Sequence, residues 1–324
     1  MTKIAAVSMV KNECDIIEWF IKLNARFVDH FFIIDHLSSD DTRSIIERLR
    51  SEGYAITCLS LEQLAFDQSA VMTRQIREVA IANQFDYIIP LDADEFVDFT
   101  ERSSFNDYLK SKISPVQLGV MEWLTFCPVA DDFYNSDNPL YEIFFPREFE
   151  PAYFTKVILG NEFAKQCVIA TGNHSAKNKR YKNAKVKLDI KLHHVPVRSS
   201  QQVVRKVLLG DYSSRLNVKR KKGDGYHWTD MACEIRANNY QLSPQKLLDF
   251  ALQYSVPKDK QVPLGLNKDG PRIGVAGMSV KVTDESRINL VRAFDMYTAS
   301  LVEEQIRRNR GFFQSVKRYF GFSS

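Results

Sequence analysis

Strand and helix patterns alternate along the first hundred residues, and this alternation restricts the fold more than any other feature of the sequence. Four short apolar runs have the composition of buried strands, and the segments between them carry apolar residues at helical spacing. The strands are predicted at 4–10, 31–35, 54–59 and 87–91, and the helices at 16–27, 42–53 and 68–83. A β-α-β series predicts an α/β fold with a mostly parallel sheet and helices on both faces.

Beyond residue 98 the pattern is less regular. Strands are predicted at 117–126, 155–159 and 185–193, helices at 105–113, 200–209, 243–254 and from about 283 onward, and loops at 131–139 and 257–277. A hydrophobic content of 44% over 324 residues is enough for a large core. No apolar run approaches the length of a membrane-spanning helix.

The motif Leu91-Asp92-Ala93-Asp94-Glu95-Phe96 directly follows the fourth predicted strand. Parallel α/β sheets bind their ligands beyond the carboxyl ends of the strands. Two carboxylates two residues apart at such a position can hold a hard cation, Mg²⁺ or Mn²⁺, that bridges them to a diphosphate. The alternative is a polar turn in which Asp94 or Glu95 caps the next element.

The ends of the first two predicted strands are also polar. Lys11-Asn12-Glu13 follows the first strand, and Asp35 ends the second strand before the polar turn at 38–42. A carboxylate in such a place can accept hydrogen bonds from a nucleobase or a ribose, although these residue types are equally suited to cap helices. Arg74 and Arg77, on the helix before the fourth strand, either orient a pyrophosphate or face solvent.

Five motifs in this order resemble those of the family 2-like glycosyltransferases, which have the GT-A fold. The motifs are Val10-Lys-Asn-Glu13 with Glu18-Trp19, Asp35 with Ser39-Asp-Asp-Thr42, Leu91 to Phe96, Val120-Met-Glu-Trp123 with Phe126, and His194-Val-Pro-Val-Arg-Ser199 with Lys206. In the last motif Val195 replaces the usual aromatic residue. The resemblance spans roughly residues 3–210, and it implies a nucleotide-sugar-binding GT-A fold with a mostly parallel central sheet flanked by helices.

The resemblance implies a division of the chain into two parts. Residues 1–215 are expected to form the catalytic domain, with the nucleotide-sugar part at about 1–100 and the acceptor part at about 101–215. Residues 216–324 are expected to form a mainly helical C-terminal extension.

The resemblance also implies roles for individual residues. A divalent metal, Mn²⁺ or Mg²⁺, is expected on Asp94, Asp92 and His194, with His174 as a second candidate for the ligand from late in the chain. The nucleotide-sugar donor is expected to contact Lys11, Asn12, Glu13, Asp35, Arg74, Asp92, Ala93, Arg198 and Lys206. Without the resemblance, His193-His194 beside Pro196 has the pattern of a polar strand end.

The implied reaction moves a sugar from a nucleotide-diphosphate donor to a hydroxyl group of a glycan or lipid-linked acceptor, with inversion by direct displacement. A metal and basic side chains stabilise the departing diphosphate, and a carboxylate takes the proton of the acceptor hydroxyl. The first candidates for this base are Asp132 and Asp131, in the loop after the Trp123 strand, and Glu122, Glu148 and Glu150 compete with them. Assembly of surface polysaccharide or lipopolysaccharide is the commonest setting of such enzymes.

The net charge of +4 is the sum of two opposed regions. Residues 86–150 hold 14 acidic and 4 basic side chains, whereas residues 177–222 hold 15 basic and 2 acidic ones. The acidic region contains the expected metal ligands, and the basic region contains the residues expected to neutralise the diphosphate. Two ordinary solvated surfaces of opposite charge are the alternative.

Cysteine usage and the C-terminal segment bear on the location of the chain. The five cysteines are scattered without a CxxC pair, which is typical of reduced thiols in a cytoplasmic enzyme. Residues 307–322 interleave basic and aromatic side chains, a composition that suits peripheral contact with the inner face of the plasma membrane. Packing of this segment on the core or on a second subunit is the alternative.

Two other functions fit part of the sequence. The basic segment 177–222, with aromatic residues nearby, has the composition of a nucleic-acid-binding surface, but this hypothesis leaves the carboxylates at the strand ends unexplained. A nucleotidyltransferase on a related α/β sheet is expected to have a glycine-rich phosphate loop where Lys11-Asn12-Glu13 stands. We therefore expect an enzyme with no nucleic-acid partner.

Overall fold

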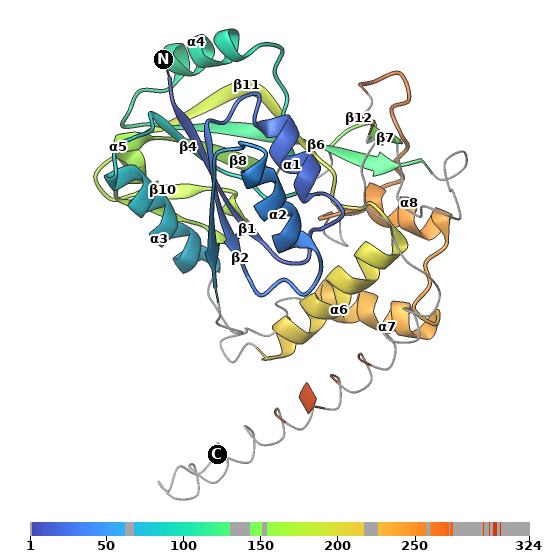
Figure 1. Cartoon of the computed structure of the whole chain (residues 1–324). Helices are drawn as coiled ribbons and strands as arrows, with labels where there is room; N and C mark the ends of the chain where they lie inside the picture. The colour runs from blue at the N-terminus through green and yellow to red at the C-terminus, as the bar shows by residue number, and fades with distance from the viewer. Residues whose placement is uncertain are drawn as a thin grey trace, which may run out of the picture. The chain divides into compact units, whose positions relative to one another are not determined.

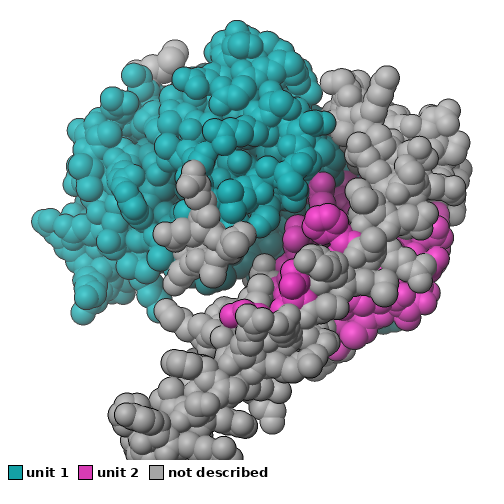
Figure 2. Space-filling model, turned by 60° about the horizontal axis from the view of Figure 1, so that its bottom comes forward, with its two compact units in different colours: residues 1–129, 141–196, 248–280 teal, residues 130–140, 197–247, 281–324 magenta. Residues whose placement is uncertain are grey.

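The chain forms two compact units, which Figure 2 shows in different colours. Unit 1 comprises residues 1–129, 141–196 and 248–280, and unit 2 comprises residues 130–140, 197–247 and 281–324. The computed structural model describes residues 2–61, 68–129, 143–150, 154–216, 226–256, 260–271, 273–274, 294, 298, 301–302 and 305. The predicted loop at 131–139 and most of the predicted helix after 283 lie outside these residues.

The first part of unit 1 has the predicted alternation of strands and helices (Figure 1). Its elements are β1 (Ile4–Val10), α1 (Ile17–Asn24), β2 (His30–Asp35), α2 (Thr42–Ser51), β3 (Ile56–Ser60), α3 (Gln68–Ile81) and β4 (Tyr87–Pro90). Gly53 follows α2 with a φ of +99°, a conformation that a glycine adopts without strain, and this confirms its predicted place at the end of the helix.

The later elements include several that have no clear periodicity in the sequence. The elements are β5 (Glu95–Val97), α4 (Arg102–Lys112), β6 (Leu118–Pro128), β7 (Ile143–Pro146), β8 (Thr155–Gly160), α5 (Asn161–Ala164), β9 (Cys167–Ile169), the 3₁₀ turn η1 (Thr171–Asn173), β10 (Ala176–Asn178), β11 (Lys185–His194), α6 (Ser200–Leu216), α7 (Tyr226–Ala237), α8 (Pro244–Leu252) and β12 (Ile273–Gly274). The predicted strands at 117–126, 155–159 and 185–193 and the predicted helices at 105–113, 200–209 and 243–254 are all present.

The central sheet is parallel in its first part and mixed beyond it. The strand order is β12-β7-β6-β8-β4-β1-β2-β3, and β4, β1, β2 and β3 are parallel as predicted. Strand β8 lies antiparallel between β4 and β6, and β11 pairs in parallel with β6 and antiparallel with β5. Because β8 reverses the direction, β6 and β11 again run the same way as β4.

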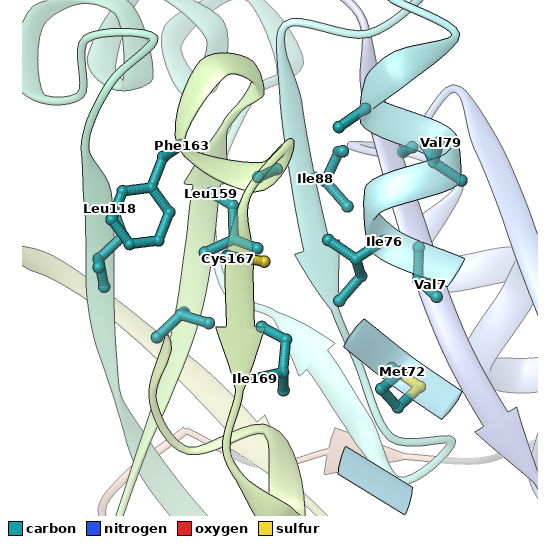
Figure 3. Packing of buried hydrophobic residues seen from close by; sticks show 14 of the residues in the cluster. Val7, Met72, Ile76, Val79, Ile88, Leu118, Leu159, Phe163, Cys167 and Ile169 are labelled. Atoms are coloured by element: carbon teal, nitrogen blue, oxygen red, sulfur yellow. The ribbon is translucent and has the colours of Figure 1, made fainter. Parts of the chain in front are cut away.

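Helices cover both faces of the parallel part. On one face, Met72, Ile76 and Val79 of α3 pack into a buried cluster with Val7 of β1 and Ile88 of β4 (Figure 3). On the other face, Phe31 of β2 is paired with Ala6 of β1, and its ring meets the ring of Phe20 from α1 at 5.8 Å. Helix α2 lies beside α1 (Figure 1), and an ion pair between Arg48 and Glu18 (2.8 Å) joins the two helices.

Burial of these apolar side chains fixes the sheet rigidly. Each fully buried aliphatic or aromatic side chain contributes about 1.5–3 kcal/mol relative to an exposed one. The ends of the strands are therefore held in fixed places, and the residues that follow them keep a defined geometry. Among the described residues, no helix is long and apolar enough to cross a membrane.

Candidate functional site

The candidate site lies in unit 1, at the edge of the sheet where the parallel strands end. Strands β1, β2 and β4 end there at Val10, Asp35 and Pro90, and β11 ends at the same edge with His194. The antiparallel β8 begins at this edge with Thr155 and Lys156. Side chains from five strands therefore meet at one edge, which is where α/β sheets bind ligands.

The loops after β1 and β2 are joined by hydrogen bonds. The backbone N–H of Asn12 donates to Ser38 Oγ (2.9 Å), and the Asn12 side-chain oxygen accepts from the N–H of Ser39 (2.7 Å). The N–H of Glu13 donates to Thr42 Oγ1 (2.8 Å). Asn12 has a φ of +58°, a conformation that asparagine tolerates better than most residues. Asn12 and Glu13 thus shape this edge through backbone and side-chain contacts between the two loops.

The carboxylate of Asp35 lies just beneath these loops. Asp35 is almost fully buried, and its Oδ1 accepts a hydrogen bond from the N–H of Ser38 (3.3 Å). Burial lowers the pKa of the neighbouring Lys11, and the charge of Asp35 opposes this effect. Lys11 and Asp35 therefore form a polar pair of opposite charge at the ends of β1 and β2.

Asp92 is held by one residue of the adjacent strand β8 and one residue of the turn η1. Its Oδ2 accepts from the ammonium group of Lys156 (2.5 Å), and its Oδ1 accepts from the side-chain amide of Asn173 (3.1 Å). Lys156 also donates to the carbonyl oxygen of Gly172 (2.8 Å). Both Asp92 oxygens are thus engaged within the protein, although 32% of the side chain stays accessible to solvent.

Glu95 lies beneath Asp92 and is completely buried. Its Oε1 accepts from the indole N–H of Trp123 (2.9 Å) and is 3.1 Å from the Lys156 ammonium nitrogen, while its Oε2 accepts from the backbone N–H of Asp92 (2.9 Å). Burial raises the pKa of Glu95, and the positive charge of Lys156 only partly offsets this effect. Burial alone would lower the pKa of Lys156, but the carboxylates of Asp92 and Glu95 outweigh it and raise this pKa.

The short strand β5 brings the second aspartate of the motif to His194. Strand β5 pairs with the end of β11, so that Glu95 lies opposite His194, and the N–H of Val195 donates to the carbonyl of Asp94 (2.8 Å). The Asp94 Oδ2 and His194 Nε2 atoms are 3.8 Å apart, and both side chains are largely buried. The fold thus brings together Asp94 and His194, which are a hundred residues apart in the sequence.

Aromatic rings surround this pair. The His194 ring stacks on Trp123 with centroids 4.0 Å apart and planes 20° apart, and Tyr254 meets its edge at 5.4 Å. The His174 ring also packs against Trp123, with the two ring centroids 5.1 Å apart. Burial and the nearby Lys156 charge lower the pKa of His174, which favours its neutral form.

The other predicted residues lie on α3, in unit 2, or outside the described residues. Arg74 is exposed on α3 and pairs with Glu78 (2.8 Å). Arg198 and Lys206 belong to unit 2, where Arg198 precedes α6 and Lys206 lies within it. Asp131 and Asp132 lie outside the described residues.

The competing glutamates are each engaged elsewhere. Glu122 pairs with Lys187 (2.8 Å), and Glu148 Oε2 accepts from the N–H of Gly265 (3.2 Å). Glu150 pairs with the buried guanidinium of Arg147 and accepts the N–H of Thr125. These pairs are structural in kind, and they anchor β6 and β7 to their surroundings.

Asp94 and His194 together fit a divalent cation only in part. Two ligands that each bind one cation at about 2.1 Å lie at most about 4.2 Å apart, so the separation of 3.8 Å between Asp94 and His194 is compatible with a shared ion. Among the described residues, no group of three or more His, Cys, Asp or Glu side chains is placed to hold a metal. Phosphate oxygens and water would supply further ligands, as is usual for Mg²⁺ in nucleotide sites.

Sequence reasoning missed Lys156, Asn173 and Tyr254. Lys156 stands second in a short apolar run, where a lysine ordinarily faces solvent, and only the antiparallel register of β8 turns it into the sheet edge. Asn173 adjoins His174, which the sequence analysis did name, and the Gly172-Asn173 pair is a recognisable turn signal. Tyr254 is the last residue of the predicted helix 243–254, and nothing in its neighbourhood in the sequence indicates His194 as a contact.

Comparisons with known proteins yield structural likeness only. No protein family and no curated protein matches the chain. Solved structures that resemble it include S. aureus TarS 1-349 in complex with UDP-GlcNAc, at 10% identity over 79% of this chain and 77% of that one, with a TM-score of 0.39. GalNAc-T7 with UDP, GalNAc and Mn²⁺ resembles it at 10% identity over 79% and 56%, with a TM-score of 0.38. Likeness at this level does not establish a shared activity.

Proposed function

We propose that the chain is a glycosyltransferase of the family 2-like, GT-A type, which transfers a sugar from a nucleotide-diphosphate donor to a hydroxyl group of an acceptor. The observation that carries this proposal is the joint placement of Asp92, Asp94 and His194 at the carboxyl edge of the parallel strands. The loops that carry Asn12 and Asp35 lie at the ends of the adjacent strands. Residues far apart in the sequence therefore supply the two regions that such a donor needs, one for the nucleoside and one for the diphosphate.

The nucleoside is assigned to the end of β1 and β2. The Asp35 carboxylate, next to Lys11, supplies hydrogen-bond acceptors beside a cation, which suits the polar edge of a base and its ribose. Lys11, Asn12 and Glu13 line the loop above it. This assignment follows the motif order and is supported by the hydrogen bonds that fix both loops.

The diphosphate and its cation are assigned to the edge of β4 and β11. Asp94 and His194 would hold a divalent metal, Mn²⁺ or Mg²⁺, and Asp92 and Ala93 lie beside them. When bound, the metal neutralises the negative charge that builds up on the departing diphosphate. Asp92 is positioned by Lys156 and Asn173 to accept hydrogen bonds from the donor through its solvent-accessible part.

The remaining groups of the reaction belong to the same proposal. Asp132 or Asp131 is the candidate base for the acceptor hydroxyl, in an inverting displacement, and Arg198 and Lys206 are candidates for neutralising the leaving group. A glycan or lipid-linked acceptor and a place in surface-polysaccharide or lipopolysaccharide assembly complete it. The segment 307–322 would give peripheral contact with the inner face of the plasma membrane.

A thermal-unfolding screen tests the proposal without knowledge of the acceptor. The full chain is heated with the four common ribonucleoside diphosphates and with nucleotide sugars, each with and without Mn²⁺. A ligand at 100 times its Kd stabilises the folded state by about 2.7 kcal/mol, so the correct nucleotide raises the Tm by several degrees. Stabilisation by an oligonucleotide together with no response to any nucleotide sugar would favour the nucleic-acid-binding alternative instead.

A further inference from the structure

Lys156 is a fully buried cation within the acidic cluster of Asp92, Asp94 and Glu95. Its side chain has no solvent exposure, and its ammonium nitrogen lies 2.5 Å from Asp92 Oδ2 and 3.1 Å from Glu95 Oε1. The third contact is the carbonyl oxygen of Gly172 at 2.8 Å. Removing an ammonium group from water is costly unless charged and hydrogen-bonding partners replace the solvent, and here three oxygen atoms do so.

The fold places this lysine at the site. In β8, Lys156 is paired with Met121 of β6, and β8 also pairs with β4, whose end carries the aspartate motif. The ammonium group lies 5.8 Å from the centroid of the Trp123 ring, on which His194 also stacks. Lys156 therefore lies beside the tryptophan on which His194 stacks, and it contacts the carboxylates of the two residues, Asp92 and Glu95, that flank Asp94 in the motif.

We propose that Lys156 is a resident counter-cation that sets the affinity of this cluster for a divalent metal. The inference rests on the proposed function, because it concerns the metal on Asp94 and His194. Lys156 acts in two ways. Its charge repels a second cation in the cluster, and its ion pair with Asp92, supported by Asn173, keeps that carboxylate out of the metal's ligand set.

The functional consequence is coupled binding of metal and donor. If Asp94 and His194 are its ligands from the described part of the chain, the metal would bind weakly alone and would gain further ligands from the diphosphate of the donor. Lys156 thus makes it unfavourable for the metal to remain after the diphosphate has left. It is a positioning residue, because it acts through Asp92 and through its charge rather than on the reacting atoms.

Direct titration of Mn²⁺ tests this role without any assay of turnover. Free Mn²⁺ is followed by electron paramagnetic resonance in the presence of the full chain and no nucleotide. Lys156→Met removes the charge and keeps a similar length, and it is expected to bind Mn²⁺ at least about tenfold more tightly, because a cation–cation repulsion at short range is lost. Lys156→Arg keeps the charge and is expected to bind as weakly as the wild type.

A matched control and a second variant complete the test. Lys165→Met, in the exposed pair with Glu162 on α5, is expected to leave the Mn²⁺ affinity unchanged. Asp92→Asn removes the charge of the other partner in the ion pair. It gives a result even if Lys156→Met does not fold. Because the inference excludes Asp92 from the ligand set, this variant should lose only the effect of one neighbouring charge, a weakening of about tenfold, which is similar in size to the gain in Lys156→Met.

The outcomes separate the inference from the proposed function. Equal Mn²⁺ affinity of the wild type and Lys156→Met, or a hundredfold loss in Asp92→Asn, would overturn the role of Lys156 and leave the glycosyltransferase proposal standing. Failure of the wild type to bind Mn²⁺ even with a nucleoside diphosphate would overturn both. Tighter binding in Lys156→Met together with a loss of about tenfold or less in Asp92→Asn supports the inference.

Discussion

Trp123 connects the buried acid of the site to its histidine. The indole N–H donates to Glu95 (2.9 Å), and the face of the same ring stacks on His194. Trp123 itself is 7% exposed. A tryptophan is suited to this place because it combines a large apolar face with one hydrogen-bond donor at its edge. The residue therefore fixes Glu95 and His194 relative to each other.

Substitution of Trp123 by phenylalanine keeps an aromatic ring and removes the donor. Glu95 then loses one of its hydrogen bonds while completely buried, so Trp123→Phe is expected to lower the free energy of unfolding by about 2–3 kcal/mol in urea denaturation. Trp19→Phe is the matched control, since Trp19 is half-buried and packs on Phe96. Its expected cost is about 1 kcal/mol or less. Equal losses in the two variants would contradict the role of the Trp123 donor.

At the scale of single residues, the sequence indicated Asp92, Asp94 and His194, but it did not indicate the partners of Asp92 and Glu95. The motif after β4 indicated Asp92 and Asp94, and the order of motifs indicated His194. Lys156 could not be predicted, because its inward direction depends on the register between β8 and β6. The alternative for Glu95 was that it caps the next element. The structure instead buries Glu95 against Trp123 and Lys156, in a short strand that has no recognisable periodicity in the sequence.

At the scale of elements, the turn η1 connects three parts of the site. Gly172 has a φ of +72° and Asn173 a φ of +59°, and this pair of left-handed residues directs the Gly172 carbonyl to Lys156 and the Asn173 amide to Asp92. The Thr155 hydroxyl donates to the carbonyl oxygen of His174 (3.0 Å) and so ties the turn to the start of β8. The conformation of this one turn therefore controls the contacts of Asp92.

Gly172→Ala tests the turn, and Gly53→Ala is its control. Both glycines have a positive φ, and forcing alanine into this region costs about 1–2 kcal/mol. A Cβ at Gly172 would also lie 2.6 Å from His174 Nε2, whereas nothing lies within 4 Å at Gly53. Gly172→Ala is therefore expected to cost at least about 1 kcal/mol more than Gly53→Ala in urea denaturation. A smaller loss in Gly172→Ala would show that the turn adapts freely.

Long periodic elements could be predicted from the sequence, and short ones could not. Strand β1, with an apolar run of seven residues, and helix α2, with three apolar residues on one face and Gly53 after it, lie close to their predicted positions. Strands β5 and β9 have three residues each, too few for an alternating pattern to stand out. They form because neighbouring strands offer them hydrogen bonds, which is information that is not local in the sequence.

At the scale of the whole molecule, the five cysteines differ in how far their thiols are exposed to solvent. All five are free thiols. Cys127 and Cys167 are completely buried, and burial raises the pKa of each to about 12. Cys14 and Cys58 are half-buried, and Cys233 is exposed. The five thiols therefore divide into two buried, two half-buried and one exposed.

Alkylation followed by mass spectrometry tests this distribution. Unfolded protein that has not been treated with a reductant is expected to take up five alkyl groups, because no thiol is in a disulfide. In the native protein at neutral pH, Cys233 is expected to react first, while Cys127 and Cys167 stay unmodified because their thiols are buried and protonated. Fewer than five groups on the unfolded chain, or early labelling of Cys127, would contradict the described packing.

Asp94 and His194 are proposed to hold the cation of a bound nucleotide diphosphate, and calorimetric titration of the wild type and Asp94→Asn measures their contribution. The nucleoside diphosphate that stabilises the chain most is titrated in the presence of Mn²⁺ and in the presence of a chelator. The matched control is Asp98→Asn, because Asp98 forms a similar pair with His193 (3.1 Å) but is half exposed. The account predicts Mn²⁺-dependent binding in the wild type and in Asp98→Asn, and at least about a hundredfold loss in Asp94→Asn, which corresponds to about 2.8 kcal/mol. Unchanged affinity in Asp94→Asn, or equal binding with chelator, would contradict it.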